Sequence, residues 1–90
     1  MKSKIYFVYY LESSKDGSYY IGVTNCVRRR LFEHNSGLSK STASKKPWIL
    51  RKTEEYPNIN LAYQREIFLK KKKSKKIIEK IINSPDVHQR

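Results

Sequence analysis

The sequence predicts an α+β fold, in which a small three-stranded antiparallel sheet is flanked by helices in the order β-β-α-β-α-α. Three observations predict it: two apolar, aromatic segments joined by a turn signal, a third alternating segment, and helical periodicity in the segments that follow the second and third of these. One sheet with a few helices suits a chain of 90 residues, which has room for a single core.

The first two strands are predicted to form a hairpin. Residues 4–12 (KIYFVYYLE) are apolar and aromatic almost without interruption, which is typical of a strand covered on both faces. The pair Asp16-Gly17 is a strong signal for a hairpin turn, and residues 19–23 (YYIGV) are the expected partner strand. A short turn between them makes the two strands antiparallel.

A helix is expected directly after the hairpin, from about Cys26 to Ser36. Thr24 and Asn25 can cap its start. Gly37 stands at the position after the helix, where glycine ends many helices in a left-handed conformation.

The third strand is expected at residues 48–56 (WILRKTEEY), which alternate between apolar and polar. Before it, residues 36–46 are small, polar and basic, and this composition predicts a mobile loop. We expect one domain over residues 1–83 and a frayed tail over residues 84–90.

Two helices are expected to complete the chain. The turn at residues 57–60 can cap a helix starting near Leu61, and the like charges of residues 70–73 should weaken or bend that helix. Ser74 can cap the last helix. Its apolar stripe consists of Ile77, Ile78, Ile81 and Ile82.

The charge balance indicates a polyanionic partner. Lys and Arg number 20 against 8 Asp and Glu, which leaves a net charge of +12 and a pI near 10.0. Nucleic acid is the first candidate, with DNA favoured over RNA; an anionic membrane surface and a merely solvated lysine-rich surface are the alternatives. The apolar run from Ile5 to Leu11 is too short to span a bilayer. One cysteine excludes an internal disulfide, and a cytoplasmic location is expected.

Several chemistries lack their residues. The three glycines belong to no phosphate-binding loop, and one cysteine with two histidines cannot form a zinc site of the Cys/His type. The acidic residues show no spacing that suggests a cluster sharing two metal ions. Any metal site should therefore hold one ion with few protein ligands.

The hairpin places three residues of interest on one face. With a two-residue turn, Tyr9, Tyr20 and Gly22 project from the same side of the sheet. Gly22 leaves bare backbone that another group can approach closely. The alternative is that both tyrosines are ordinary core aromatics with a solvated hydroxyl.

The first helix divides its arginines between two faces. Val27 and Leu31 define an inward stripe, on which His34 falls, with Arg30 at its edge. A cation at the edge of a core needs a partner. The alternative is a snorkelling arginine and a core histidine whose hydrogen bonds are satisfied. Two arginines point toward solvent or a ligand: Arg28 and Arg29.

On the second helix, Glu66 is the acid nearest to an apolar face. It continues a ladder with Ala62 and Leu69 at helical spacing, although Arg65 lies closer to the centre of the stripe. The alternative is a surface pair between Arg65 and Glu66, which would contribute little.

These residues resemble the signature of the GIY-YIG nuclease superfamily. Residues 7–9 (FVY) and 20–22 (YIG) are similar to its paired tripeptides, and Arg30, ten positions after Tyr20, matches its arginine. His34 matches the histidine or tyrosine one turn later, and Glu66 in AYQRE matches the metal-binding glutamate. The resemblance covers residues 4–80 and is strongest to small stand-alone members related to the N-terminal nuclease domain of the excinuclease.

The resemblance has two departures. The first tripeptide keeps only its tyrosine, Tyr9. The late asparagine of many members has no clear counterpart, and Asn83 is the best candidate. We also expect no added DNA-targeting domain in these 90 residues.

The resemblance implies hydrolysis of DNA phosphodiesters with one divalent ion, Mg²⁺ or Mn²⁺, held by Glu66, in a setting such as DNA repair. Arg30 would neutralise phosphoryl charge, and Tyr9 would accept the proton of water once its pKa is lowered by Arg30 and the ion. Tyr20 and His34 would orient water or phosphate. The competing interpretation is a nucleic-acid-binding module without turnover.

Binding would come from cations outside this site, which meet phosphates and read no sequence, so weak sequence preference is expected. One small site would nick one strand at a time, and double-strand cleavage would need two copies or a partner protein. The expected phosphate-binding residues are Arg28, Arg29, Lys40, Lys45, Lys46, Lys70, Lys71, Lys72 and Lys73.

Overall fold

The computed structural model describes residues 4–85 and confirms the predicted order of elements. The strands and helices are β1 (Tyr6–Ser13), β2 (Tyr19–Thr24), α1 (Val27–Ser36), the short 3₁₀ helix η1 (Lys40–Lys45), β3 (Trp48–Tyr56), α2 (Ile59–Lys72) and α3 (Lys75–Asn83).

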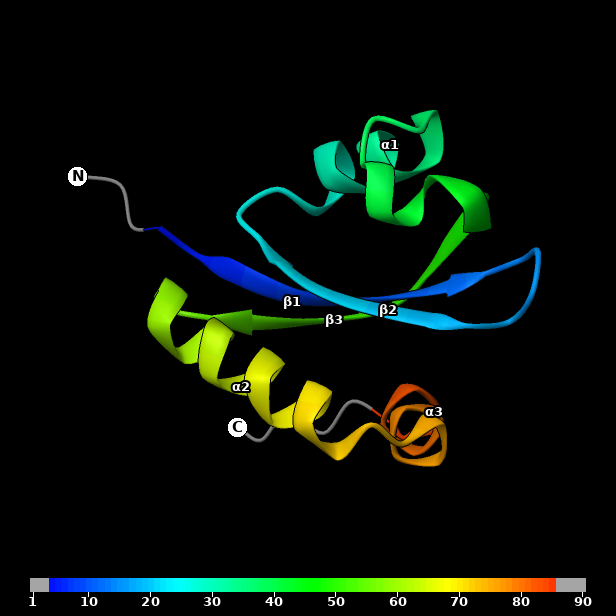
Figure 1. The fold of residues 1–90 in the computed structure, drawn as a ribbon. Helices are drawn as coiled ribbons and strands as arrows, with labels where there is room; N and C mark the ends of the chain where they lie inside the picture. The colour runs from blue at the N-terminus through cyan, green and yellow to red at the C-terminus, as the bar shows by residue number, and fades with distance from the viewer. Residues whose placement is uncertain (1–3, 86–90) are drawn as a thin grey trace.

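The sheet has three antiparallel strands in the order β2-β1-β3, so β1 lies in the centre. Helix α1 lies on one face of this sheet, and helices α2 and α3 lie on the other (Figure 1). Because both faces of β1 are covered, four consecutive residues of the strand are fully buried, which explains its continuous apolar sequence. These are Val8, Tyr9, Tyr10 and Leu11.

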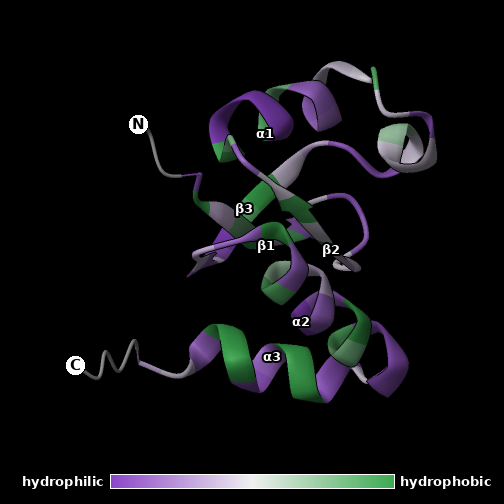
Figure 2. Cartoon of the chain, turned by 90° about the vertical axis from the view of Figure 1, so that its left-hand side faces the viewer, coloured by the Kyte–Doolittle hydropathy of each residue, from purple (hydrophilic) through white to green (hydrophobic). Residues whose placement is uncertain are grey.

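Two small cores result from this three-layer arrangement. On the α1 side, Tyr9 and Leu11 pack with Trp48 and with Val27 and Leu31 of the helix. The core on the other side is larger and includes the inward residues of α2 and α3. Its buried members are Val8, Tyr10, Ile21, Ala62, Leu69 and Ile78. The hydropathy colouring shows the apolar bands of α3 that complete this core (Figure 2).

The hairpin loop is longer than predicted, yet the predicted faces are correct. A two-residue turn at Asp16-Gly17 would set Tyr9 opposite Thr24, whereas Tyr9 pairs with Gly22. The difference is two residues along the strand, and side chains alternate with a period of two, so each side chain keeps its face. Gly17 has the left-handed φ of 76° that the loop requires.

The start of α1 differs from the prediction, and its end agrees. The residue at the N-cap is Cys26, which makes no side-chain capping bond. The hydroxyl of Thr24 accepts a hydrogen bond from the Cys26 amide at 3.1 Å, which shapes the turn before the helix. Gly37 ends α1 with a left-handed φ of 84°.

The segment expected to be a mobile loop contains the 3₁₀ helix η1. A contact with Trp48 helps to hold η1 in place, because the Trp48 indole donates to the Thr42 carbonyl at 3.0 Å. Asn35 of α1 pairs with the backbone of Trp48 in both directions, at 3.1 Å and 2.6 Å. These contacts are tertiary, so local composition does not reveal them.

Side-chain caps define α2 and α3. Asn58 accepts from the Leu61 amide at 3.0 Å and starts α2 at Ile59, two residues before the predicted start. The lysine run ends α2 instead of bending it, because Lys73 takes a left-handed φ of 48°. Ser74 accepts from the Ile77 amide at 3.2 Å and caps α3 as predicted.

Two sequence-based expectations concern the ends and the membrane. The predicted tail lies largely outside the described residues, and within them Ser84 is the exposed residue that follows α3. Across residues 4–85, none of the helices combines the length and apolarity needed to cross a bilayer.

Candidate active site

Tyr9 lies in the centre of the site, with its ring over Gly22 on the neighbouring strand. The side chain is 2% exposed. A Cβ atom at position 22 would lie 2.4 Å from the Tyr9 hydroxyl oxygen and 2.5 Å from Cζ. No such contact is tolerated, so the ring can lie here only because residue 22 is glycine. The group expected to approach the bare backbone of Gly22 is therefore Tyr9 itself.

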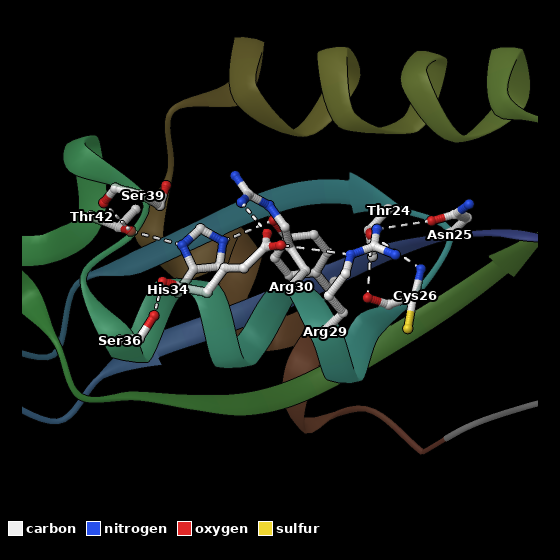
Figure 3. A network of polar contacts seen from close by, with 11 residues as sticks. Thr24, Asn25, Cys26, Arg29, Arg30, His34, Ser36, Ser39 and Thr42 are labelled. Carbon is white, nitrogen blue, oxygen red and sulfur yellow. Dashed lines mark hydrogen bonds and ion pairs between the residues drawn. The ribbon is translucent and has the colours of Figure 1, made fainter.

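The hydroxyl of Tyr9 belongs to a buried chain of hydrogen bonds through His34. The Tyr9 hydroxyl lies 3.0 Å from Nε2 of His34. Nδ1 of the same ring lies 2.7 Å from Oγ1 of Thr42 (Figure 3). The Thr42 hydroxyl donates to the Ser39 carbonyl at 3.3 Å. Thr42 therefore accepts from Nδ1–H, which leaves Nε2 of a neutral ring to accept from the Tyr9 hydroxyl.

The pKa values of this pair favour the neutral forms. Burial lowers the pKa of His34, and the positive charge of Arg30 lowers it further. Burial, assisted by Tyr20, raises the pKa of Tyr9 to about 12, although Arg30 opposes this shift. The resemblance implies that Arg30 and the ion bring the Tyr9 pKa down; in the protein without substrate, burial outweighs the effect of Arg30.

Arg30 lies at the edge of α1, between Tyr9 and Glu33. Its Nη1 donates to Oε1 of Glu33 at 2.8 Å, and its hydrogen bond to Tyr9 helps to raise the arginine pKa, after the larger effect of Glu33. The side chain remains 31% exposed. The partner that a cation at this position requires is thus Glu33, and part of the guanidinium remains accessible to a ligand.

Tyr20 extends the site toward the β2 edge of the sheet. Its ring meets the His34 ring edge to face with centroids 4.9 Å apart, and it lies 6.2 Å from the Tyr9 ring. The ammonium of Lys70 lies 5.7 Å from the centroid of Tyr20. Tyr20 therefore joins the residues of α1 to a residue of α2, which lies on the opposite face of the sheet.

Glu66 lies on α2 and is linked to Tyr20 through Lys70. Its carboxylate accepts a hydrogen bond from Nζ of Lys70 at 2.9 Å, and its side chain is 17% exposed. The charge of Glu66 contributes to the raised pKa of Tyr9, which places the two groups within electrostatic range. Arg65 does not pair with Glu66; it forms a two-pronged contact with Glu54 at 3.0 Å and 3.1 Å.

The expected phosphate-binding residues fall into two groups. Five lie on α1 or on η1 and its end, and four lie on α2 and its end, across the sheet from the first group (Figure 1). Three already hold acidic partners: Arg29 with Glu33 at 3.7 Å, Lys45 with Asp16 at 3.7 Å, and Lys70 with Glu66 at 2.9 Å.

Asn83 is placed at the exposed end of α3. It lines a surface hollow together with other residues of that helix, such as Lys80 and Glu79. Tyr9, Tyr20, Arg30 and His34 lie together, and Lys70 links Glu66 to Tyr20. Asn83 stays a prediction from the resemblance alone.

Two residues of the site were not assigned these positions from the sequence. Thr42 orients His34, but a threonine in a small, polar, basic segment carries no signal of burial. Lys70 was expected only as a phosphate contact. Its spacing of four residues from Glu66 is the signal that could have indicated their pairing.

The residues present fit one weakly held divalent ion. Among the described residues, no three His, Cys, Asp or Glu side chains gather into a group that could hold a metal. A single carboxylate suits Mg²⁺, which keeps several waters and takes other ligands from substrate phosphates. Glu66 could supply that carboxylate.

Comparison with known proteins identifies the class of domain to which this fold and arrangement belong. A family profile described as "GIY-YIG catalytic domain" matches residues 5–80, so the chain belongs to the GIY-YIG family. GIY-YIG proteins are in general endonucleases. No solved structure matches the chain significantly.

Similar curated proteins carry the name UPF0213. One from Halobacterium salinarum is 42% identical over 67 residues, which are 73% of this chain and 86% of the relative. One from Streptococcus pneumoniae serotype 4 is 43% identical over 68 residues, 74% of this chain and 68% of the relative. One from Bacillus cereus strain ZK is 36% identical over 63 residues, 69% of this chain and 66% of that protein's length.

Proposed function

We propose that this protein is a divalent-metal-dependent endonuclease that nicks DNA with weak sequence preference. The observation that carries the proposal is the buried chain Tyr9–His34–Thr42, with the Arg30 guanidinium beside Tyr9. Nε2 of a neutral His34 already accepts from the buried phenol, so it is positioned to take the proton of that phenol.

The proton path follows from these contacts. A phenol with a pKa of about 12 is protonated at neutral pH, so Tyr9 cannot begin as a phenolate. In the proposed step, a water O–H bond breaks as Tyr9 takes its proton, and the original phenol proton passes to Nε2 of His34. The hydroxide formed attacks phosphorus, and the P–O bond to the leaving oxygen breaks. Tyr20, stacked edge to face on His34, would orient water or phosphate.

Two further groups complete the proposed chemistry. Arg30, 31% exposed, would donate N–H bonds to phosphoryl oxygens as their charge increases. Glu66, with water and a substrate phosphate, would hold Mg²⁺ or Mn²⁺. When bound, the ion would polarise the phosphate and stabilise the leaving oxygen.

The proposed weak sequence preference follows from the surface charge. The cations on α1, η1 and α2 would contact phosphates, and such contacts position a duplex without reading its sequence. We expect DNA to be preferred over RNA. Cleavage of both strands would need two copies of the chain or a partner protein.

The test is a nicking assay on supercoiled, branched and single-stranded DNA, with RNA in parallel. We expect nicking with Mn²⁺ that is lost with EDTA and in Glu66→Gln. Glu79→Gln is the matched control, because Glu79 is an exposed acid on α3. Tight binding of these substrates without cleavage would overturn the proposal in favour of a non-catalytic binding module.

A further inference from the structure

We propose that Lys70 is a built-in counterion of Glu66, which the divalent ion must displace, so that ion and nucleic acid bind together. The inference rests on the proposed function, because it concerns the carboxylate that would hold the ion. It assigns to Lys70 a role that the other lysines of its run do not have.

The geometry sets Lys70 apart from its neighbours. Its Nζ lies 2.9 Å from Oε2 of Glu66 and 5.7 Å from the centroid of the Tyr20 ring. Glu66 is 17% exposed and Lys70 is 53% exposed. The ammonium thus lies against the carboxylate and near an aromatic ring of the site, while about half of the side chain is exposed to solvent.

This position opposes metal binding in the absence of substrate. The ammonium uses a carboxylate oxygen that a cation would need, and it repels a divalent ion at short range. The chain already carries a net charge of +12, which disfavours cations generally. With one carboxylate as the protein ligand, we expect the affinity of the free protein for Mn²⁺ to be low.

A phosphate would reverse this balance. An exposed lysine pair is weak and the lysine side chain is long, so Nζ can move from the carboxylate to a phosphate oxygen at little cost. The Glu66 carboxylate would then face the same phosphate, and the carboxylate and the phosphate could both be ligands of the ion. Because coupling is reciprocal, the ion would also strengthen binding of nucleic acid.

An ordinary helical surface pair is the alternative, and Lys71 separates the two. Lys71 carries the same charge, is exposed, and by helical periodicity points away from the sheet. If only the overall charge matters, Lys70→Met and Lys71→Met should change Mn²⁺ affinity equally. If Lys70 competes for Glu66, only Lys70→Met has a further effect.

The experiment measures Mn²⁺ binding by electron paramagnetic resonance in the full chain, with and without a phosphorothioate duplex. We expect Lys70→Met to bind Mn²⁺ about twofold to fivefold more tightly than Lys71→Met without DNA, the range that an exposed pair allows. The duplex should tighten Mn²⁺ binding by a larger factor in the wild type than in Lys70→Met. Glu66→Gln, measured with the same duplex, subtracts the binding of Mn²⁺ to DNA itself.

Two outcomes distinguish a failure of the proposed role of Lys70 from a failure of the proposed metal site. Equal affinities in the two lysine variants, with binding still sensitive to Glu66→Gln, would overturn the role of Lys70 and leave the proposed metal site standing. Binding that does not depend on Glu66, even with DNA, would overturn the metal site and the role of Lys70 with it. Circular dichroism of both lysine variants checks that they fold alike.

Discussion

Tyr9 and Tyr10 are neighbours in the chain with opposite surroundings. Strand alternation points the Tyr9 hydroxyl at His34, at 3.0 Å, and the Tyr10 hydroxyl at Glu54, at 2.9 Å on the other face. If Tyr9 relays the proton, Tyr9→Phe should lower the nicking rate by about 10²-fold or more. Tyr10→Phe is the matched control and should retain most of the rate. Single-turnover nicking by both variants checks this, and equal rates would remove Tyr9 from the role.

The absence of a side chain at Gly22 leaves the room that the Tyr9 ring occupies. Gly22→Ala would place a Cβ atom 2.4 Å from the Tyr9 hydroxyl oxygen, so the ring must move away from His34. We expect a loss of about 1–3 kcal/mol in the free energy of unfolding, typical of overpacking, together with a loss of nicking. Urea unfolding measures the first effect.

The control measures the effect of Gly22→Ala in a protein that already carries Tyr9→Ala, which lacks the ring that the new methyl group would meet. In this background Gly22→Ala should cost much less. An equal cost in both backgrounds would mean that the glycine is needed for another reason.

His34 makes stability depend on pH. Its pKa is lowered in the folded protein, mainly by burial, so the unfolded chain binds the proton more readily. The stabilisation is complete above the unfolded pKa, near 6.5, and is lost as the pH falls from there toward the lowered folded value. Urea unfolding from pH 7.5 to pH 5 should show a slope of at most about 1.4 kcal/mol per pH unit from this one group.

The variant His34→Gln isolates that contribution. Its absolute stability will differ from that of the wild type, because the ring contacts are lost, but its dependence on pH over the same range should be flatter. The same slope in both proteins would assign the effect to other groups.

At the scale of the elements, Glu54 ties α2 to the sheet. This carboxylate of β3 accepts from Nε and Nη2 of Arg65 and from the hydroxyls of Tyr10 and Tyr56. Burial, followed by the effect of Glu54, raises the pKa of Tyr56 to about 12. The position of Glu66 on α2 therefore depends on an acid that lies outside the site.

Glu54→Gln should lower the free energy of unfolding by about 1–3 kcal/mol, because it removes the charge from several hydrogen bonds at once. Glu55→Gln changes the next residue of the same strand, which is exposed, and serves as the control. Urea unfolding compares the two variants. If both are equally stable, the contact between Glu54 and Arg65 does not anchor α2.

The elements also show what local sequence patterns can predict. The order of elements along the chain, the hairpin faces, a capping turn before α2 and the cap at Ser74 were predictable, because period and capping chemistry are local. The helix η1 was not, since its order comes from contacts of Thr42 with His34 and Trp48. In the site, helical period placed His34 inward, whereas no local pattern indicated the hydrogen bonds around its ring.

At the scale of the whole molecule, the cations differ in whether an acidic side chain already pairs with them. Some cations are engaged by acids near the site, as Arg30 is by Glu33 and Lys70 by Glu66. Others, such as Arg28 and Lys40, are exposed on α1 and η1. The second kind is proposed to give affinity for a polyanion without contributing to chemistry, and the two effects should then separate in mutants.

Salt dependence of DNA binding measures that separation. If about five cations meet phosphates, log affinity should fall with log salt concentration at a slope of about −4 to −5 on duplex DNA. Arg28→Gln should make the slope less steep by about one, because one phosphate contact is lost, while the nicking rate of bound DNA stays the same. Lys80→Gln removes an equal charge from the outer surface of α3 and should leave the slope nearly unchanged. Fluorescence anisotropy over a range of KCl concentrations gives all three slopes. If both variants reduce the slope equally, the molecule attracts DNA through its net charge alone, and α1 is not a defined contact surface.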